Sequence, residues 1–247
     1  MNLSTEALLA LLIVALYLKD SLLLLRPDEA VLVRGLGGWR AGFGARGYKL
    51  AGKEPWLANP LAPHAPVWRL GWAMRGEGTP PTADAAAWQP ALSPLARLAP
   101  FACFSWGLLF VVIPTAVLAQ WGVVATLGAV ALLYLNIAAG LGVTWLQRRP
   151  LGLGARAFAL LAFECLVCAP YSANLVRRLS LAQRPSEDFT AAAARLLTPF
   201  ALAEVHRECV ARIDEQLEAE PEGGPAAQAL QRARQRFATP STTENAR

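Results

Sequence analysis

The sequence has few of the side chains that most often carry catalysis or bind metals. It holds two histidines, His64 and His206, which lie far apart in the chain. Because a structural zinc ion needs four ligands, we predict no metal site. No GxSxG, HExxH or phosphate-binding glycine loop occurs, so we also expect no catalytic residue and no cofactor. The most economical interpretation is that the protein is not an enzyme.

The four cysteines do not form the pattern of a disulfide-rich secreted domain. Cys103, Cys165 and Cys168 lie in apolar runs, and Cys209 lies in a predicted helix. Cys165 and Cys168 form a CxxC, which could act as a thiol pair or supply half of a metal site. Buried thiols without a nearby cation stay protonated and inert, so we favour the interpretation that both are packing residues.

Acidic residues are scarce in the middle of the chain. Residues 98–181 carry five arginines and a single carboxylate, Glu164, whereas the tail from Ala182 holds eight basic and ten acidic residues. The net charge of +5 therefore comes from basic residues beside apolar runs. Membrane orientation and anionic lipid explain that placement better than nucleic acid does. We predict membrane lipid, and no nucleic acid, as a partner.

Long apolar runs dominate the sequence. The three longest cover residues 98–119, 121–146 and 155–176. Runs of about 20 apolar residues can cross a hydrocarbon core about 30 Å thick. A further run, Ala7–Leu25, is interrupted by Lys19 and Asp20. The pattern predicts a mainly α, polytopic helical membrane protein with about four hydrophobic helices, placed in the cytoplasmic (inner) membrane of the cell.

Composition divides the chain into six expected segments. These are a first transmembrane helix (1–27), a small β-rich extramembrane module (28–76), a Pro/Ala linker (77–97), the membrane helices (98–181), an amphipathic helical tail (182–237) and a disordered end (238–247). In residues 28–76, aromatic residues alternate with glycine and proline without a helical period, which is typical of short strands and turns. The alternative is a partly ordered loop whose tryptophans lie among lipid headgroups.

The second and third runs are expected to form an antiparallel hairpin, because only Gln120 separates them. Pro114 should kink the second helix. Small and weakly polar residues recur along one face of the third: Gly122, Thr126, Ala129, Leu133, Asn136, Gly140 and Thr144. Such a face permits close helix packing, and a transport path along it is the less favoured interpretation.

The last apolar run carries a polar face and a proline. One side of a helix there would hold Arg156, Glu164, Cys168, Tyr171, Asn174 and Arg178, and Pro170 should bend or break it. We hypothesise that Glu164 pairs with Lys19 of the first helix. The alternative is that Lys19 reaches the interface and Asp20 is solvated. The candidate polar residues inside the bundle are Lys19, Asp20, Asn136, Glu164, Cys168, Tyr171 and Asn174.

The tail contains a predicted amphipathic helix that starts at Thr198-Pro199, with proline in its favoured first position. Its apolar stripe consists of Leu202, Val205, Cys209, Ile213 and Leu217. We expect this stripe to dock a protein partner or a second copy of the chain. Gly223-Gly224-Pro225 should end this segment, and a shorter basic helix, 226–237, should follow.

Two functions from different classes are compatible with these features. The favoured one is a non-catalytic membrane anchor or accessory subunit that docks a partner through the β-rich module and the tail helix. The alternative is a small channel or transporter component that uses the Glu164 face after oligomerisation. A membrane thiol enzyme using Cys165 and Cys168 has the least support. The basic residues favour an external N-terminus with residues 26–97 in the cytoplasm, and the reverse orientation is the runner-up.

Overall fold

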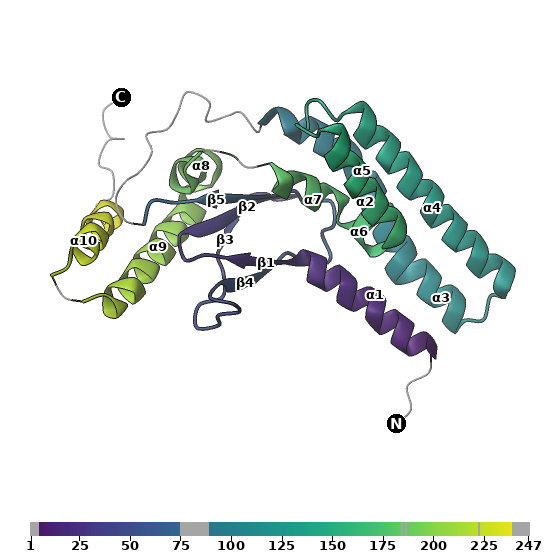
Figure 1. The fold of residues 1–247 in the computed structure, drawn as a ribbon, viewed down its shortest axis with the longest axis horizontal. Helices are drawn as coiled ribbons and strands as arrows, with labels where there is room; N and C mark the ends of the chain where they lie inside the picture. Colours follow the sequence, from purple (N-terminus) through teal and green to yellow (C-terminus); the bar gives the residue numbers. More distant parts are fainter. Residues whose placement is uncertain (1–4, 75–88, 184, 186, 222, 239–247) are drawn as a thin grey trace. The chain divides into compact units, whose positions relative to one another are not determined.

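Residues 5–74, 89–183, 185, 187–221 and 223–238 are described by a computed structural model, which is mainly helical with a small N-terminal β region (Figure 1). Two units divide the chain: unit 1 is 1–23, 55–68 and 86–184, and unit 2 is 24–54, 69–85 and 185–247. The expected β-rich module and helical tail thus contribute to the same unit. Residues 77–88 of the expected linker and 239–247 of the expected disordered end lie outside the described residues.

Unit 1 consists mostly of helices. They are α1 (Thr5–Ser21), α2 (Leu92–Gly107), a π-helical segment (Leu108–Val112), α3 (Ile113–Leu118), α4 (Val123–Leu146), α5 (Ala155–Val167), α6 (Pro170–Ala173) and α7 (Leu175–Ala182). A 3₁₀ turn, Gln89–Ala91, precedes α2. Two helical stretches of the described chain, Leu92–Leu118 and Val123–Leu146, are long and apolar enough to cross a membrane. The expectation of about four such helices is therefore supported for two.

The first helix is shorter than predicted. It ends at Ser21, and Leu22–Leu25 forms strand β1, which pairs with β4 (Glu54–Leu57), instead of extending the helix. The Ser21 carbonyl accepts a hydrogen bond from the Ala58 backbone N–H, at 3.1 Å, so the helix end is satisfied from outside the helix. Periodicity could not separate the two outcomes, because a short run of leucines fits either a helix or a buried strand.

The second helix begins earlier than predicted, at Leu92, within the range assigned to the linker. Leu95 and Leu98 are buried, and their burial stabilises a helix that also contains Pro94 and Pro100. Pro94 lies in the first turn, where a backbone N–H would have no helical partner. Further along, the predicted kink at Pro114 takes the form of a π-helical segment that ends just before it.

The helix hairpin is present. The turn after α3 contains Gln120 at φ 51° and Gly122 at φ 89°, and α4 then packs on α2 and α3. Asn136 of α4 donates to the Phe101 carbonyl and to Ser105 Oγ, both at 2.9 Å. A Cβ on Gly140 would lie 3.2 Å from Phe101 Cβ, so the glycine permits this close approach.

The last apolar run is not one helix. Helix α5 ends at Val167, Pro170 starts the short α6, and α7 begins at Leu175. Pro170 has no N–H and clashes with the preceding turn, which accounts for the break. The predicted polar face is therefore distributed over three helices of different direction.

Unit 2 combines strands from the first part of the chain with helices from the last. Strand β2 (Glu29–Gly35) pairs antiparallel with β3 (Gly38–Gly42), with Gly35 opposite Gly38, in a three-stranded sheet of order β3-β2-β5, where β5 is Val67–Gly71. Gly38 has φ 104°, which its missing side chain allows. The glycine-rich residues 35–42 thus form the turn and the second strand of a β-hairpin.

Three helices complete unit 2: α8 (Phe189–Leu196), α9 (Pro199–Ala219) and α10 (Pro225–Ala238). Asp188 caps α8 by accepting from the Thr190 and Ala191 backbone N–H groups, and Thr198 caps α9, as its predicted start requires. The core holds Val31 and Leu32 of β2, Phe189 of α8, Ile213 of α9 and Leu230 of α10, all buried.

A buried ion pair lies beside this core. Arg212 and Glu54, with side chains 1% and 3% exposed, are joined at 2.5 Å, and Arg212 also donates to the Gly44 carbonyl at 2.6 Å. Glu208, which is more exposed, accepts from Arg212 Nε at 3.1 Å. Arg212 is the one charge that Glu54 contacts in the described chain, whereas Arg212 retains Glu208 if Glu54 is lost.

This asymmetry predicts unequal effects of removing the two partners. Arg212→Met leaves the Glu54 carboxylate buried without a counter-charge and should lower the free energy of unfolding by about 3 to 5 kcal/mol. Glu54→Gln should cost less, and adding it to Arg212→Met should restore part of the loss. Chemical denaturation of the purified chain measures these changes. Arg46→Gln, which removes an exposed partner of Glu208, is the control and should cost less than about 1 kcal/mol. Equal effects of Arg46→Gln and Arg212→Met would contradict the argument.

Candidate functional site

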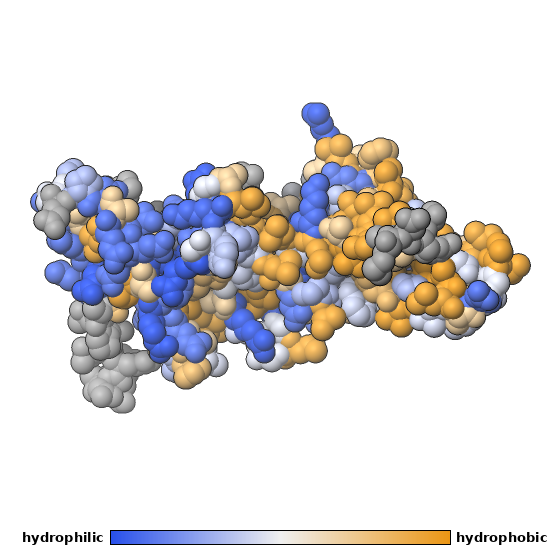
Figure 2. Space-filling model, turned by 90° about the horizontal axis from the view of Figure 1, so that it is seen from below, coloured by the Kyte–Doolittle hydropathy of each residue, from blue (hydrophilic) through white to orange (hydrophobic). Residues whose placement is uncertain are grey.

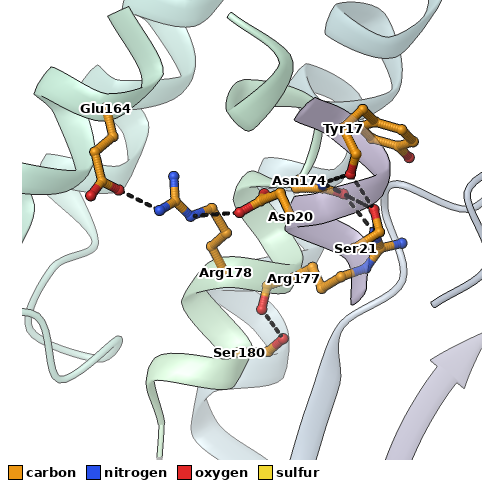
Figure 3. Close-up of polar contacts among 8 residues, drawn as sticks. All are labelled: Tyr17, Asp20, Ser21, Glu164, Asn174, Arg177, Arg178 and Ser180. Atoms are coloured by element: carbon orange, nitrogen blue, oxygen red, sulfur yellow. Dashed lines mark hydrogen bonds and ion pairs between the residues drawn. The ribbon is translucent and has the colours of Figure 1, made fainter. Parts of the chain in front are cut away.

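The most extensive polar cluster of unit 1 surrounds Arg177 of α7 (Figure 3). This side chain is 1% exposed. Nη1 donates to Asn174 Oδ1 at 2.6 Å and to Ser21 Oγ at 2.8 Å. Nη2 donates to the carbonyls of Asn59 and Ala62, at 3.1 and 3.3 Å. One guanidinium thus joins the end of α1, the loop after β4 and the start of α7.

Neighbouring hydrogen bonds join the same segments. Asn174 Nδ2 donates to the Tyr17 carbonyl at 3.3 Å and to Ser21 Oγ at 3.2 Å. Tyr17 Oη donates to the Pro60 carbonyl at 2.7 Å. Ser180 Oγ donates to the Arg177 carbonyl and accepts from the Val67 backbone N–H, at 2.9 and 2.8 Å. The cluster therefore couples loop 55–68 to helices on both sides of it.

Arg178, the next residue, connects the two carboxylates of this region. It pairs with Glu164 of α5, and its Nε lies 3.7 Å from Asp20 Oδ1 of α1 (Figure 3). Its guanidinium also lies over the Tyr171 ring, 4.6 Å from the centroid. The hypothesised Lys19–Glu164 pair is wrong: Glu164 pairs with Arg178, and Lys19 is exposed. The break at Pro170 brings Arg178 within reach of both carboxylates.

The hydrogen bonds and ion pairs of the cluster hold several helices together. Both carboxylates have an arginine partner, and Arg177 bonds mostly to uncharged oxygens. Three buried atoms, Asp20 Oδ2, Arg177 Nε and Arg178 Nη1, lack a hydrogen-bond partner within the described ranges. Nothing in this arrangement supplies a nucleophile with a free base beside it.

Sequence reasoning missed Ser21, Arg177 and Ser180. Ser21 stands in a run of apolar residues, and Arg177 resembles the positive charge that normally ends a membrane helix. One signal was available for Arg177. Arg177 and Arg178 lie three and four residues after Asn174, a spacing that places side chains on one face of a helix. Asp20, Glu164, Tyr171 and Asn174 were candidates and do come together here. Asn136 lies apart, between α4 and α2.

The cysteines occupy different environments. Cys165 is buried in α5, and Cys168 is half-buried where that helix ends. Cys103 is exposed on α2, and its Sγ lies 3.6 Å from Nδ1 of His64, a residue of the loop after β4. This thiol–imidazole contact joins residues distant in the sequence and was not foreseen. In the part of the chain that the structure describes, no group of three or more His, Cys, Asp or Glu could hold a metal ion.

The apolar stripe of the tail helix is covered by its own unit. Val205, Cys209 and Ile213 are buried, and Leu202 and Leu217 are half-buried. The stripe packs on the β-hairpin, α8 and α10, so its central residues are not open to a partner as expected.

Burial also raises the pKa of the Cys209 thiol to about 12, although Arg212 nearby opposes the shift. On the same helix, burial lowers the pKa of His206, whose ring lies 5.8 Å from that of Phe237.

A groove of about 770 Å³ lies in unit 2 between the β3 edge and α9. Its floor includes Phe43, whose ring lies under the Arg212 guanidinium, 5.1 Å away. Its lining residues are Arg40, Ala41, Gly42, Phe43, Gly44 and Arg46 on one side, and Ala201, Glu204, Val205, Arg207, Glu208 and Ala211 on the other. The groove therefore joins the two segments that the sequence indicated as partner-binding, on the face of α9 beside its stripe.

Comparisons with protein-family models, with curated proteins and with solved structures find no significant match.

Substitutions at Arg177 and at Glu164 compare how much the buried part of the Arg177 cluster and its exposed edge contribute to stability. Arg177→Met removes four hydrogen bonds of a buried guanidinium, two to side-chain oxygens and two to backbone carbonyls, and a hydrogen bond to a charged group contributes about 1.5 to 3 kcal/mol. We therefore expect a loss of at least about 3 kcal/mol. Glu164→Gln should cost no more than about 1 kcal/mol, because that side chain is 44% exposed and Arg178 retains Asp20. Thermal unfolding of the detergent-solubilised chain distinguishes them, and equal midpoints would refute the role given to Arg177.

The thiols should differ in reactivity. Iodoacetamide should modify the exposed Cys103 before Cys165 and Cys209, because both of these thiols are buried and the pKa of Cys209 is about 12. His64→Gln should slow the modification of Cys103 several-fold, if the imidazole accepts its proton. Mass spectrometry of peptides after timed labelling measures both rates. Labelling Cys209 as fast as Cys103 in the folded chain would disagree with the packing of α9.

Proposed function

We propose that the protein is a non-catalytic, multi-pass integral membrane protein of the cytoplasmic membrane, in which unit 1 anchors unit 2 and unit 2 docks a protein partner. The exposure of the two apolar helices carries this proposal. A core helix of a soluble protein is mostly buried, whereas only 28% and 22% of the most apolar windows of Leu92–Leu118 and Val123–Leu146 are buried. Hydrocarbon is the solvent that suits such surfaces.

Further apolar surface on unit 1 supports the same environment. Leu8, Leu11 and Leu12 of α1 and Leu160 and Phe163 of α5 are all more than half exposed. Figure 2 shows hydrophobic residues gathered over the helices of this unit. At 17 residues, α1 is at the lower end of the length that can span, and α5, at 13 residues, is too short, so we propose that α1 crosses the membrane and that α5 packs beside the hairpin.

The distribution of charge supports an orientation. The turn after α4 contains Arg148 and Arg149, whereas the turn before it, at Gln120, has no charge. Basic turns favour the cytoplasm. We propose that the Arg148 turn and residues 26–97 face the cytoplasm and that the N-terminus is external.

The groove between β3 and α9 is the proposed docking surface for a partner. The sequence predicted the apolar stripe of α9 as the docking surface, but other elements of unit 2 cover that stripe, and we therefore propose the groove instead. The occupant we propose is an extended segment of another protein lying along the exposed edge of β3, whose unpaired backbone groups can add a strand. A second copy of the chain is the competing occupant.

A channel or transporter component remains the second candidate, on the observation that three polar atoms of the Arg177 cluster are buried without partners. It has less support because Glu164 and Asp20 are already paired with Arg178. Glu164→Gln separates the two functions: it should abolish transport in a channel and leave an anchor intact.

Two linked measurements test the anchoring function. The chain should remain in the membrane pellet after alkaline carbonate extraction, and its release would contradict the proposal. A photoreactive amino acid in place of Ala201, in the groove, should then crosslink another protein in native membranes. The same amino acid in place of Gln235, on α10, is the matched control and should give no such product. Crosslinking only to a second copy would replace the partner by a homo-oligomer.

A further inference from the structure

Three arginines lie in and directly after the turn between α4 and α5. Arg148 and Arg149 are in the turn and Arg156 is in the first turn of α5; together with the Trp145 indole at the end of α4 they are called the basic patch. Trp145 is 41% exposed and the next residue, Leu146, is 82% exposed. Apolar helix surface and positive charge therefore meet at this point. In a membrane protein, this combination occurs at the level of the lipid headgroups.

No carboxylate balances the patch from within the sequence around it. Residues 85–163 contain neither aspartate nor glutamate, and Glu164 is already paired with Arg178. Arg149 and Arg156 are exposed, and Arg148 is half-buried. Two positive charges in the turn and a third in the first turn of α5 therefore create a local potential that favours an anion.

The patch is also held in a defined shape. The Arg148 guanidinium lies 3.8 Å from the centroid of the Trp145 ring, and the Phe158 ring of α5 lies 5.0 Å from the same indole. The turn is closed by hydrogen bonds from Leu153 N to the Arg148 carbonyl at 2.8 Å and from Gly152 N to the Arg149 carbonyl at 3.0 Å. Leu151 is buried beneath it. Less conformational entropy is lost when a ligand binds a turn that is already ordered.

The opposite end of α4 provides an internal contrast. The turn that contains Gln120 has an exposed tryptophan, Trp121, and no charge. Both ends of this helix thus have an interfacial aromatic residue, and only one end has arginines. The arginines thus mark the end of α4 proposed to face the cytoplasm, and cytoplasmic leaflets are the ones that carry anionic lipid.

We infer that the Arg148–Arg149–Arg156 patch binds the phosphate headgroup of an anionic phospholipid in the cytoplasmic leaflet. The arginines contact the phosphate, and Trp145 lies against the upper part of the acyl chains. Guanidinium groups bind phosphate oxygens through paired, charge-assisted hydrogen bonds. The inference rests on the proposed membrane function and deepens it by naming a lipid class.

Native mass spectrometry of the full chain in a neutral detergent tests the inference. Phosphatidylglycerol and phosphatidylcholine with the same acyl chains are added separately, and the wild type should retain the first and not the second. Each basic residue near a membrane surface contributes about 1 kcal/mol, which is about 5-fold in affinity. Arg149→Gln alone should therefore weaken phosphatidylglycerol binding about 5-fold, and the triple change R148Q/R149Q/R156Q about 100-fold.

A control variant separates a site from net charge. R207Q/R232Q/R236Q removes three exposed arginines of unit 2 and should leave phosphatidylglycerol binding unchanged. The inference is overturned if the control loses the lipid as strongly as the patch variant, if the patch variant keeps it, or if both lipids bind equally. Displacement by an equal concentration of glycerol phosphate would show a site for free phosphate and would also overturn it. Should the triple variant fail to fold, the Arg149→Gln comparison decides.

Failure of this inference can be told apart from failure of the proposed function. A chain released by alkaline carbonate overturns both. A chain that stays in the membrane and binds the two lipids equally overturns the lipid site alone.

Discussion

A fully buried guanidinium organises unit 1. Arg177 is bonded to oxygen atoms of α1, of the loop after β4 and of α7, and two of these are backbone carbonyls. A charge in that position is costly unless its hydrogen bonds are made, so the three segments have little freedom to separate. The helix break at Pro170 precedes α7, the helix that carries Arg177.

Unit 2 uses a buried arginine in a related way. Arg212 of α9 bonds to Glu54 and to the Gly44 carbonyl, so it fixes the helix to the loop after the β-hairpin. Gly44 comes so close to Glu54 that a Cβ there would lie 2.3 Å from Glu54 Cβ. The charge of Arg212 is therefore neutralised inside the unit. Arg40, Arg46 and Arg207 line the neighbouring groove.

Sequence reasoning recovered the features that depend on local pattern. The β region, the helix hairpin at Gln120 and the α9 start at Thr198-Pro199 all follow from turn residues, capping or periodicity. Prediction from the sequence failed where contacts between residues far apart in the chain decide the local structure. Leu22–Leu25 joins a strand because β4 is available, the stripe of α9 is covered by strands more than 150 residues earlier in the chain, and Glu164 finds Arg178 once the helix breaks. Similar depths of Lys19 and Glu164 in their apolar runs permit a pair, but depth does not fix the direction of a side chain around a helix.

The composition of unit 2 has a consequence for biosynthesis. Residues 24–54 leave the ribosome long before α8, α9 and α10, which supply the other half of their core. The helix hairpin is synthesised in between, so unit 2 can be completed only after it. During that interval, β2 lacks the helices that complete the core around Val31 and Leu32, and a chaperone can recognise these side chains. Termination of synthesis before α9 would leave a nascent strand pair with no cover and a ready target for quality-control proteases.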